Sequence, residues 1–204
     1  MCYLQKGTPF IYQGQEIGMT NIELKSIDEF KDMMTFNNEK TFAKLGIKGD
    51  KFLKMANAGS RENSRTPVQW DDSAYAGFST VEPWFNLNEN YKEINVAAAE
   101  ADENSILNYY RKLLKFRKEH EVAIYGDYKE HYKNSDKLYV YERNLDGEKI
   151  LVVCSFSEKC VNFEAPEGID LSKGELVLSN YKLNPVTHNS FVTRPYEARV
   201  YYFK

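Results

Sequence analysis

The spacing of apolar residues predicts a helical first part and a strand-rich second part of the chain. Between Ser26 and Met55, apolar side chains recur among charged residues at helical intervals, and Gly46 and Gly49 interrupt the pattern. We therefore expect two helices in this stretch. Asn104–Glu119 predicts another helix, because its apolar residues recur every three or four positions. Asn104 is the expected cap of that helix.

Beyond Val122 the pattern changes to short apolar or alternating runs, which are typical of strands. Leu138–Arg143 and Lys149–Phe156 flank a turn that contains Asp146-Gly147, a strong hairpin signal. Further strands are predicted at Tyr128–Tyr132, Val161–Phe163, Glu175–Ser179, Phe191–Thr193 and Arg199–Phe203. Short strands separated by turn residues predict a small antiparallel sandwich. We place a domain boundary near residue 121.

The start of the chain predicts an unusual strand. Thr8–Gly14 is a continuous apolar run, which favours a strand buried on both faces in a parallel sheet or barrel. No second strand of that type follows before Val122, and a lone strand leaves its backbone groups without partners. We therefore expect the last strand of a larger sheet. Residues 56–95 predict a long loop, and its aromatic residues, including Trp70 and Trp84, indicate that it packs.

Composition and charge exclude several classes of protein. The 204 residues carry a net charge of −3, a poor match to a nucleic-acid binder. No apolar run of about twenty residues is present, so we expect no membrane span. The first residues have no signal-peptide pattern. Cys2, Cys154 and Cys160 fit neither a disulfide framework nor a zinc site, which favours reduced thiols in a cytoplasmic protein.

The candidate chemistry does not lie in nucleophiles or metal ligands. His120, His131 and His188 are scattered and show no metal spacing or triad, so we predict no metal site and no catalytic histidine. No phosphate-cradling glycine loop occurs, and we expect no cofactor. Glycosidases use two carboxylates that flank the scissile bond. The chain has 30 acidic residues, so the sequence alone cannot single out such a pair.

The most informative stretch is Ser60–Trp70, which combines two arginines, an amide, a turn proline and a tryptophan. An arginine beside carboxylates can hold those acids ionised and donate hydrogen bonds to sugar hydroxyls. The alternative is an arginine that fastens the loop through a salt bridge. The residues alone leave both readings open.

Several motifs resemble one family in the same order along essentially the whole chain. Gly7–Asn21 resembles the segment at barrel strand eight in the oligo-1,6-glucosidase branch of glycoside hydrolase family 13. Arg61–Trp70 resembles that branch's Arg-Asp-Asn-x-Arg-Thr-Pro-Met-Gln-Trp motif. Further similar segments are Ala76-Gly77-Phe78, Glu82-Pro83-Trp84, Asn88-Glu89-Asn90-Tyr91, Ile94-Asn95-Val96, Tyr109–Leu113, Tyr125–Tyr128 and Arg194–Ala198.

The resemblance implies an α+β fragment. Residues 1–121 would hold the last strand and helices of a (β/α)8 barrel, and residues 122–204 a C-terminal antiparallel β-sandwich domain. The parent would be a retaining α-glucosidase that hydrolyses short α-glucosides, isomalto-oligosaccharides first. In the family the catalytic Asp, Glu and second Asp precede strand eight. We therefore predict no catalytic residue in this chain and no activity of the chain alone.

Alternatives remain at the level of substrate and class. Trehalose-6-phosphate hydrolases and sucrose isomerases carry similar motifs. A chain that acts as a non-catalytic carbohydrate- or partner-binding β-domain is a further alternative, which exposed aromatic side chains in a shallow groove would favour.

The resemblance also implies site residues. Arg65 matches the family arginine that contacts glucose near the third acid, so we predict that it binds substrate. Arg61 and Asn63 would shape the same loop, and Gln13 and Glu16 would support the site at the exit of strand eight. The exposed edges of that strand predict either disorder of the first twenty residues or self-association through them. Four residues depart from the family pattern, namely Gln15, Met34, Glu62 and Val68. These departures leave the preferred linkage open.

Overall fold

The structure is a computed structural model that describes residues 2–182 and 188–204, and its chain groups into two compact units. Ile11–Asn108 form one unit, and the residues up to Phe10 together with Tyr109–Lys204 form the other. This division does not test the predicted domain boundary near residue 121, which stays a prediction.

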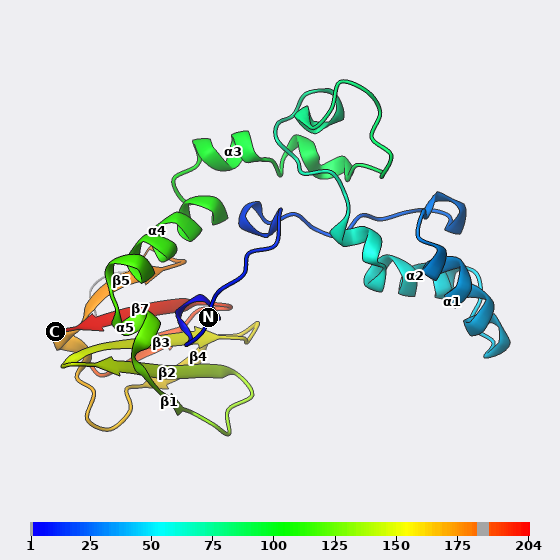
Figure 1. Ribbon diagram of the computed structural model, residues 1–204. Helices are drawn as coiled ribbons and strands as arrows, with labels where there is room; N and C mark the ends of the chain where they lie inside the picture. Colours follow the sequence, from blue (N-terminus) through cyan, green and yellow to red (C-terminus); the bar gives the residue numbers. More distant parts are fainter. Residues whose placement is uncertain (1, 183–187) are drawn as a thin grey trace. The chain divides into compact units, whose positions relative to one another are not determined.

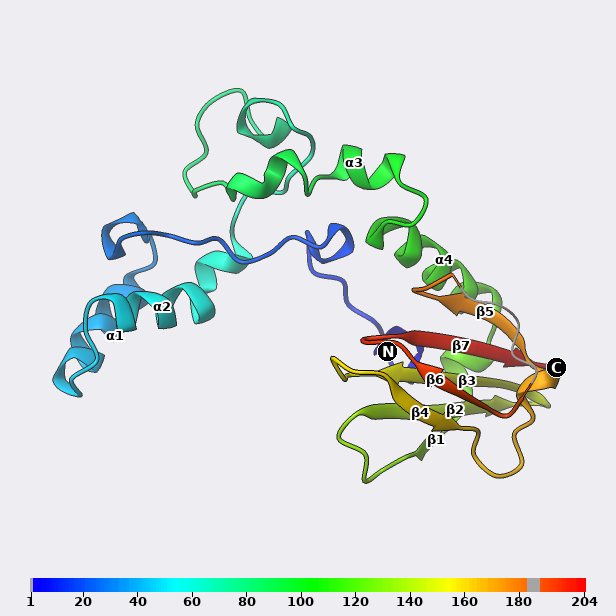
Figure 2. The ribbon, with the colours of Figure 1, turned by 180° about the vertical axis from the view of Figure 1, so that it is seen from behind.

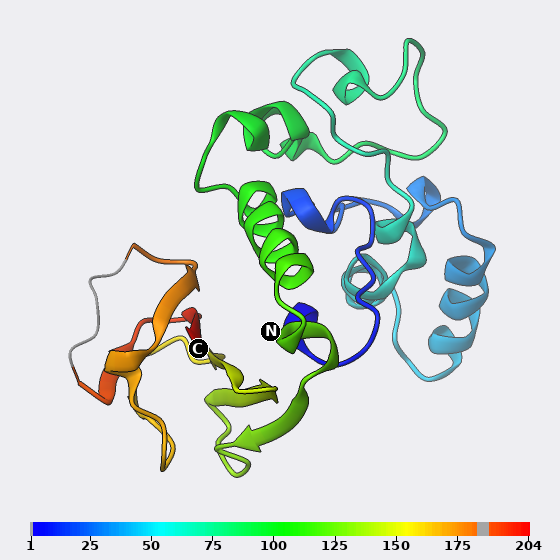
Figure 3. The same ribbon diagram turned by 60° about the vertical axis from the view of Figure 1, so that its left-hand side comes forward.

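The unit of residues 11–108 contains only helices and loops in its described part. Its two longest helices, α1 (Met33–Lys44) and α2 (Asp50–Gly59), contact each other, as Figure 3 shows. These are the two helices that the sequence predicts. The shorter helices are η2 (Gln15–Ile17), η3 (Ile27–Glu29), η4 (Arg61–Ser64), η5 (Ala74–Gly77), η6 (Glu89–Lys92) and α3 (Val96–Ala101). Its core gathers Ile22, Leu24, Phe30, Phe52 and Ala56.

Helix α4 (Ile106–Glu119) confirms the helix predicted from residue 104, but the predicted cap is wrong. The amide N–H of Asn108 donates to Ser105 Oγ at 3.2 Å, so Ser105 and not Asn104 caps the helix. Ser105 directly precedes the first helical residue, where a side-chain oxygen reaches the free N–H groups of the first turn. The short helices η1 (Cys2–Leu4) and α5 (Val122–Tyr125) belong to the second unit.

The second unit is built on a five-stranded antiparallel sheet in the order β1-β2-β3-β7-β5 (Figure 1). Beside it lies a two-stranded antiparallel sheet, β4 with β6, visible in Figure 2. The strands are β1 (Asp127–His131), β2 (Leu138–Leu145), β3 (Glu148–Ser155), β4 (Val161–Glu164), β5 (Glu175–Ser179), β6 (Ser190–Thr193) and β7 (Ala198–Phe203). All seven strands predicted beyond Val122 form, and the predicted hairpin turns at Asp146-Gly147.

The alternation of side chains along these strands makes both faces of the larger sheet apolar. On one face Tyr141 and Val152 join a cluster with Leu113 and Phe116 of α4. The opposite face carries a second cluster with Phe163 of β4 at its centre. Burial on both sides explains why Ile150–Cys154 reads as a continuous apolar run.

Two buried arginines connect the first residues of the chain to the rest of this unit. Arg117 donates to the carbonyl oxygens of Tyr3 at 2.9 Å and Gly7 at 2.7 Å. Arg143, which is fully buried, donates to the carbonyl oxygens of Leu4 at 2.8 Å and Gly126 at 2.6 Å. Burial lowers the pKa of both guanidiniums. Backbone carbonyls from separate segments therefore take the place of a carboxylate partner.

Two local predictions are wrong. No strand forms at Thr8–Gly14, because no described strand lies parallel to it, and an extended segment becomes a strand only by pairing. The tryptophans of the long loop are largely exposed, with 74% of Trp84 accessible. The loop is held instead by buried Gln69, whose Nε2 donates to Asn90 Oδ1 at 3.1 Å and to the Ile94 carbonyl at 2.6 Å.

Candidate functional site

The predicted site loop is a single 3-10 turn that begins after Ser60. Ser60 Oγ accepts the amide N–H of Glu62 at 3.2 Å, and the N–H of Arg65 closes the turn on the Glu62 carbonyl at 2.9 Å. Ser64 Oγ donates to the Arg61 carbonyl at 2.8 Å. This local hydrogen bonding brings the side chains of Arg61 and Arg65 to the same carboxylate.

That carboxylate belongs to Asp32, which is only 8% exposed. Arg61 grips it with two nitrogens, Nε to Oδ2 at 3.1 Å and Nη2 to Oδ1 at 3.3 Å. Arg65 uses one nitrogen, Nη1, at 3.1 Å from Oδ2. Asp32 also caps α1, because Oδ1 accepts the Met34 N–H at 2.9 Å. Two loop arginines and a helix start therefore share one acid.

The position of Asp32 is set by a second acid, Glu62. Its side chain is buried, and its Oε1 accepts the backbone N–H groups of Lys31 and Asp32, the latter at 2.5 Å. Hydrogen bonds to two backbone donors satisfy a buried carboxylate without a cation. Glu62 therefore ties the loop to the segment before α1.

The backbone N–H of Met34 and the guanidiniums of Arg61 and Arg65 hold the pKa of Asp32 below its usual range. Hydrogen bonds and opposite charges favour the ionised form of a carboxyl, and here they outweigh the effect of burial. Asp32 is thus a fixed negative charge at the base of both arginines.

The two arginines differ in what they leave free. Arg61 donates to both carboxylate oxygens of Asp32, through Nε and Nη2. Arg65 is 42% exposed, and within the described residues no partner is assigned to its Nε or Nη2. Arg61 therefore contacts Asp32 through two nitrogens, whereas Arg65 contacts it through one.

The other predicted residues divide into two groups. Gln13 and Asn63 line one small hollow of about 260 Å³, next to Ser64 and Thr66 on either side of Arg65. Asn63 Nδ2 donates to the Asn57 carbonyl at 2.8 Å, which supports a role in shaping the loop. Glu16 does not line this hollow, and its buried Oε2 has no hydrogen-bond partner among the residues that the structure describes.

Tyr12 links the start of this unit to the site loop. Its hydroxyl donates to the Ser64 carbonyl at 2.5 Å, directly before Arg65. The sequence predicted no site role for Tyr12 or Asp32, and it marked Glu62 only as a departure from the family pattern. The signal for Asp32 was its place directly before the helix that starts at Met33, which indicates a cap but not a partner 33 residues away.

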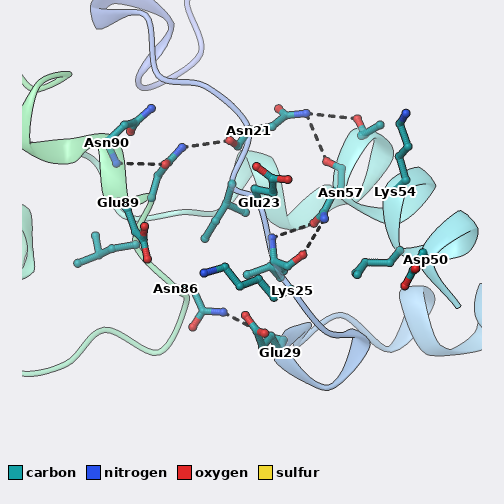
Figure 4. Close-up of a pocket in the computed structure, with 16 residues that line it drawn as sticks. Asn21, Glu23, Lys25, Glu29, Asp50, Lys54, Asn57, Asn86, Glu89 and Asn90 are labelled. Carbon is teal, nitrogen blue, oxygen red and sulfur yellow. Dashed lines mark hydrogen bonds between the residues drawn. The ribbon is translucent and has the colours of Figure 1, made fainter.

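A larger groove of about 1170 Å³ lies elsewhere in the same unit and contains none of the five predicted residues (Figure 4). Asparagine side chains that line it donate hydrogen bonds to backbone carbonyls of other lining residues. Asn57 Nδ2 donates to the Leu24 carbonyl at 2.8 Å, Asn88 Nδ2 to that of Asn21 at 3.1 Å, and Asn86 Nδ2 to that of Glu29 at 3.4 Å. These amides hold three chain segments together, so the polar lining of the groove is explained by its role in the fold.

Neither a metal centre nor a membrane span is found in the described part of the chain. Among residues 2–182 and 188–204, no group of three His, Cys, Asp or Glu side chains could hold a metal ion. The helices of these residues are all too short or too polar to cross a membrane.

Comparison with known proteins finds similar sequences and folds among glycosidases and related enzymes. The profile of the α-amylase catalytic domain matches residues 1–126. The oligo-1,6-glucosidase of Bacillus cereus is 43% identical over 205 residues, which cover 99% of this chain and 36% of that protein. The chain thus spans little more than a third of the length of the curated relative.

Solved structures agree over the same span. The trehalose-6-phosphate hydrolase of Bacillus licheniformis has a TM-score of 0.92 at 37% identity, covering 98% of this chain and 36% of that one. The isomaltulose synthase of Klebsiella sp. LX3 also has a TM-score of 0.92, at 35% identity, covering 99% of this chain and 36% of that one.

Proposed function

The chain belongs to the α-amylase family, glycoside hydrolase family 13, and on that premise we propose that it is the C-terminal part of a retaining α-glucosidase. Its preferred substrates are short α-glucosides, above all isomalto-oligosaccharides. In this proposal residues 1–121 complete a (β/α)8 barrel, and residues 122–204 form a sandwich-type β-domain. The three free thiols suit a cytoplasmic location.

One observation supports this function most directly: among the described residues, Nε and Nη2 of Arg65 have no assigned partner, while buried Asp32 holds Nη1. A guanidinium in that state can donate hydrogen bonds to adjacent sugar hydroxyls. The catalytic acids that would act on the bound glucoside are supplied by barrel strands outside these 204 residues.

The first test compares the chain with the longer protein. The longer protein, expressed from its own gene, is expected to hydrolyse p-nitrophenyl α-glucoside and isomaltose and to release the α-anomer first, seen by NMR. The 204-residue chain is expected to hydrolyse neither, because retaining hydrolysis needs a nucleophile and an acid/base. Turnover by the purified chain would show that it carries its own catalytic acids.

The choice of substrate is tested by a panel. Isomaltose, maltose, trehalose 6-phosphate and sucrose are compared by kcat/KM on the longer protein, and isomaltose is expected to lead. A higher value for trehalose 6-phosphate, or conversion of sucrose to an isomer, would reassign the enzyme within its family.

A binding module is the second candidate, and one feature of the β-domain favours it. Phe156 is exposed and lines a shallow hollow of about 450 Å³ with Tyr139 and Gln5. Aromatic rings of this kind can stack on sugars. Calorimetric titration of the chain with isomaltose decides: the α-glucosidase proposal expects no heat from this hollow, whereas heat that Phe156→Ala abolishes would establish the module.

A further inference from the structure

We propose that Asp32 is the positioning residue of the site, because it fixes one nitrogen of Arg65 and leaves the other donors for a neutral glucoside. This inference rests on the proposed function. It assigns to Asp32 a role in the site that the sequence did not indicate.

Asp32 itself is held firmly by its neighbours. Its backbone N–H donates a hydrogen bond to Oε1 of buried Glu62 at 2.5 Å. Its side-chain Oδ1 accepts a hydrogen bond from the Met34 N–H at 2.9 Å. A residue that is 8% exposed and anchored at both backbone and side chain can set the position of a longer, half-exposed one.

The carboxylate of Asp32 has no acceptor capacity left for a ligand. Oδ1 accepts from Met34 N and Arg61 Nη2, and Oδ2 accepts from Arg61 Nε and Arg65 Nη1. Two acceptor positions per oxygen are the normal capacity of a carboxylate. Asp32 therefore acts on a substrate only through Arg65, which makes it a positioning and not a catalytic residue.

The charges of the site residues balance one another. Arg61 and Arg65 contribute two positive charges, and Asp32 and Glu62 two negative ones, all joined in one hydrogen-bonded cluster. The cluster is neutral as a whole, so it offers directed donors without a surplus cation. Such a cluster suits hydroxyl groups better than a phosphate, which is bound by uncompensated arginine or lysine.

The first experiment uses the 204-residue chain itself. Rotation of the Arg65 guanidinium about its Nε–Cζ bond is measured by 15N exchange spectroscopy in wild type, Asp32→Asn and Asp32→Glu. Asp32→Asn is isosteric and keeps the Met34 cap, so the unit should stay folded. Rotation is expected to accelerate about tenfold in Asp32→Asn, because the charge-assisted hydrogen bond is lost, and less in Asp32→Glu.

The control is Asp72→Asn, which removes an exposed carboxylate from the same unit. It should leave the rotation of Arg65 unchanged. Amide spectra of all variants report whether the unit remains folded. Unchanged Arg65 rotation in a folded Asp32→Asn variant would overturn the proposal.

The second experiment measures kcat and KM of the longer protein on p-nitrophenyl α-glucoside. Asp32→Asn is expected to lower kcat/KM about 100-fold, as displacement of a substrate-positioning group does. Asp32→Glu should restore part of the loss. The double variant Asp32→Asn/Arg65→Lys should be no worse than Arg65→Lys alone, because both changes remove one coupled interaction.

The two experiments separate the possible failures. In one outcome the wild-type longer protein is active, and the losses caused by Asp32→Asn and Arg65→Lys simply add in the double variant. That result overturns the positioning role of Asp32 and leaves the α-glucosidase proposal standing. A longer protein without activity on any α-glucoside overturns the proposed function, and the proposal for Asp32 falls with it as a statement about a substrate site. The rotation of Arg65 then decides only whether Asp32 is its anchor.

Discussion

Arg61 and Arg65 share one carboxylate and use it differently. The resemblance implied that Arg65 binds substrate and that Arg61 shapes the loop, and Arg61 contacts Asp32 through two nitrogens, Nε and Nη2. Arg65 has a single contact to Asp32 and keeps its other donors. The salt bridge that seemed the alternative to substrate binding is thus compatible with it, because it occupies only one nitrogen.

The lowered pKa of Asp32 predicts an acid-dependent contribution to stability at the residue scale. Its folded pKa lies below the ordinary 3.8, so its contribution is complete above about pH 4 and is lost as pH falls through the folded value. The groups that face it are Arg61, Arg65 and Glu62. The exposed arginines are screened by solvent, so we expect Asp32→Asn to cost about 1 kcal/mol at pH 6.

Urea denaturation at pH 6 and pH 2.5, followed by circular dichroism, checks this. The difference in unfolding free energy between wild type and Asp32→Asn should shrink at the lower pH. Asp72→Asn serves as the control and should show no comparable difference. A gap that is constant with pH would mean that the charge of Asp32 does not stabilise the unit.

At the scale of elements, the hairpin β2–β3 and helix α4 follow from periodicity alone, yet their attachment depends on buried arginines. Arg143 sits in β2 and donates to carbonyls of the first segment and of α5. Such contacts connect residues up to 139 positions apart. No local pattern marks them, because an arginine in a strand usually indicates an exposed face.

Removal of Arg143 should therefore destabilise the second unit strongly. Arg143→Met keeps the apolar stem but leaves several buried carbonyls without donors, and we expect a loss of about 3 kcal/mol or more. Thermal or urea unfolding of this unit measures it. Lys137→Met, at an exposed position, is the matched control. A loss within 0.5 kcal/mol, about the range for surface substitutions, would contradict this role.

At the scale of the whole molecule, the first apolar segment is left without a sheet. Phe10 is 86% exposed and Tyr12 is 56% exposed. Exposed apolar residues in an unpaired extended segment favour association with another chain. We therefore expect the 204-residue chain to self-associate with rising concentration through this segment.

Sedimentation equilibrium over a range of concentrations tests the association. Phe10→Asp should shift the chain toward monomer, whereas Phe156→Asp, at an exposed aromatic position of the β-domain, should not. A wild-type chain that stays monomeric at every concentration would remove the basis of this prediction.

The sequence by itself determined the elements and the family. Periods of 3.6 and 2 residues mark α4 and the strands because helix and strand each expose a repeating face to a core. Motifs in a fixed order identified the glycoside hydrolase family. Only the tertiary structure decided which acid holds Arg65, that Ser105 caps α4, and that Thr8–Gly14 forms no strand. Each of these depends on a partner chosen by packing or hydrogen bonding, and a partner 33 residues away leaves no periodic trace.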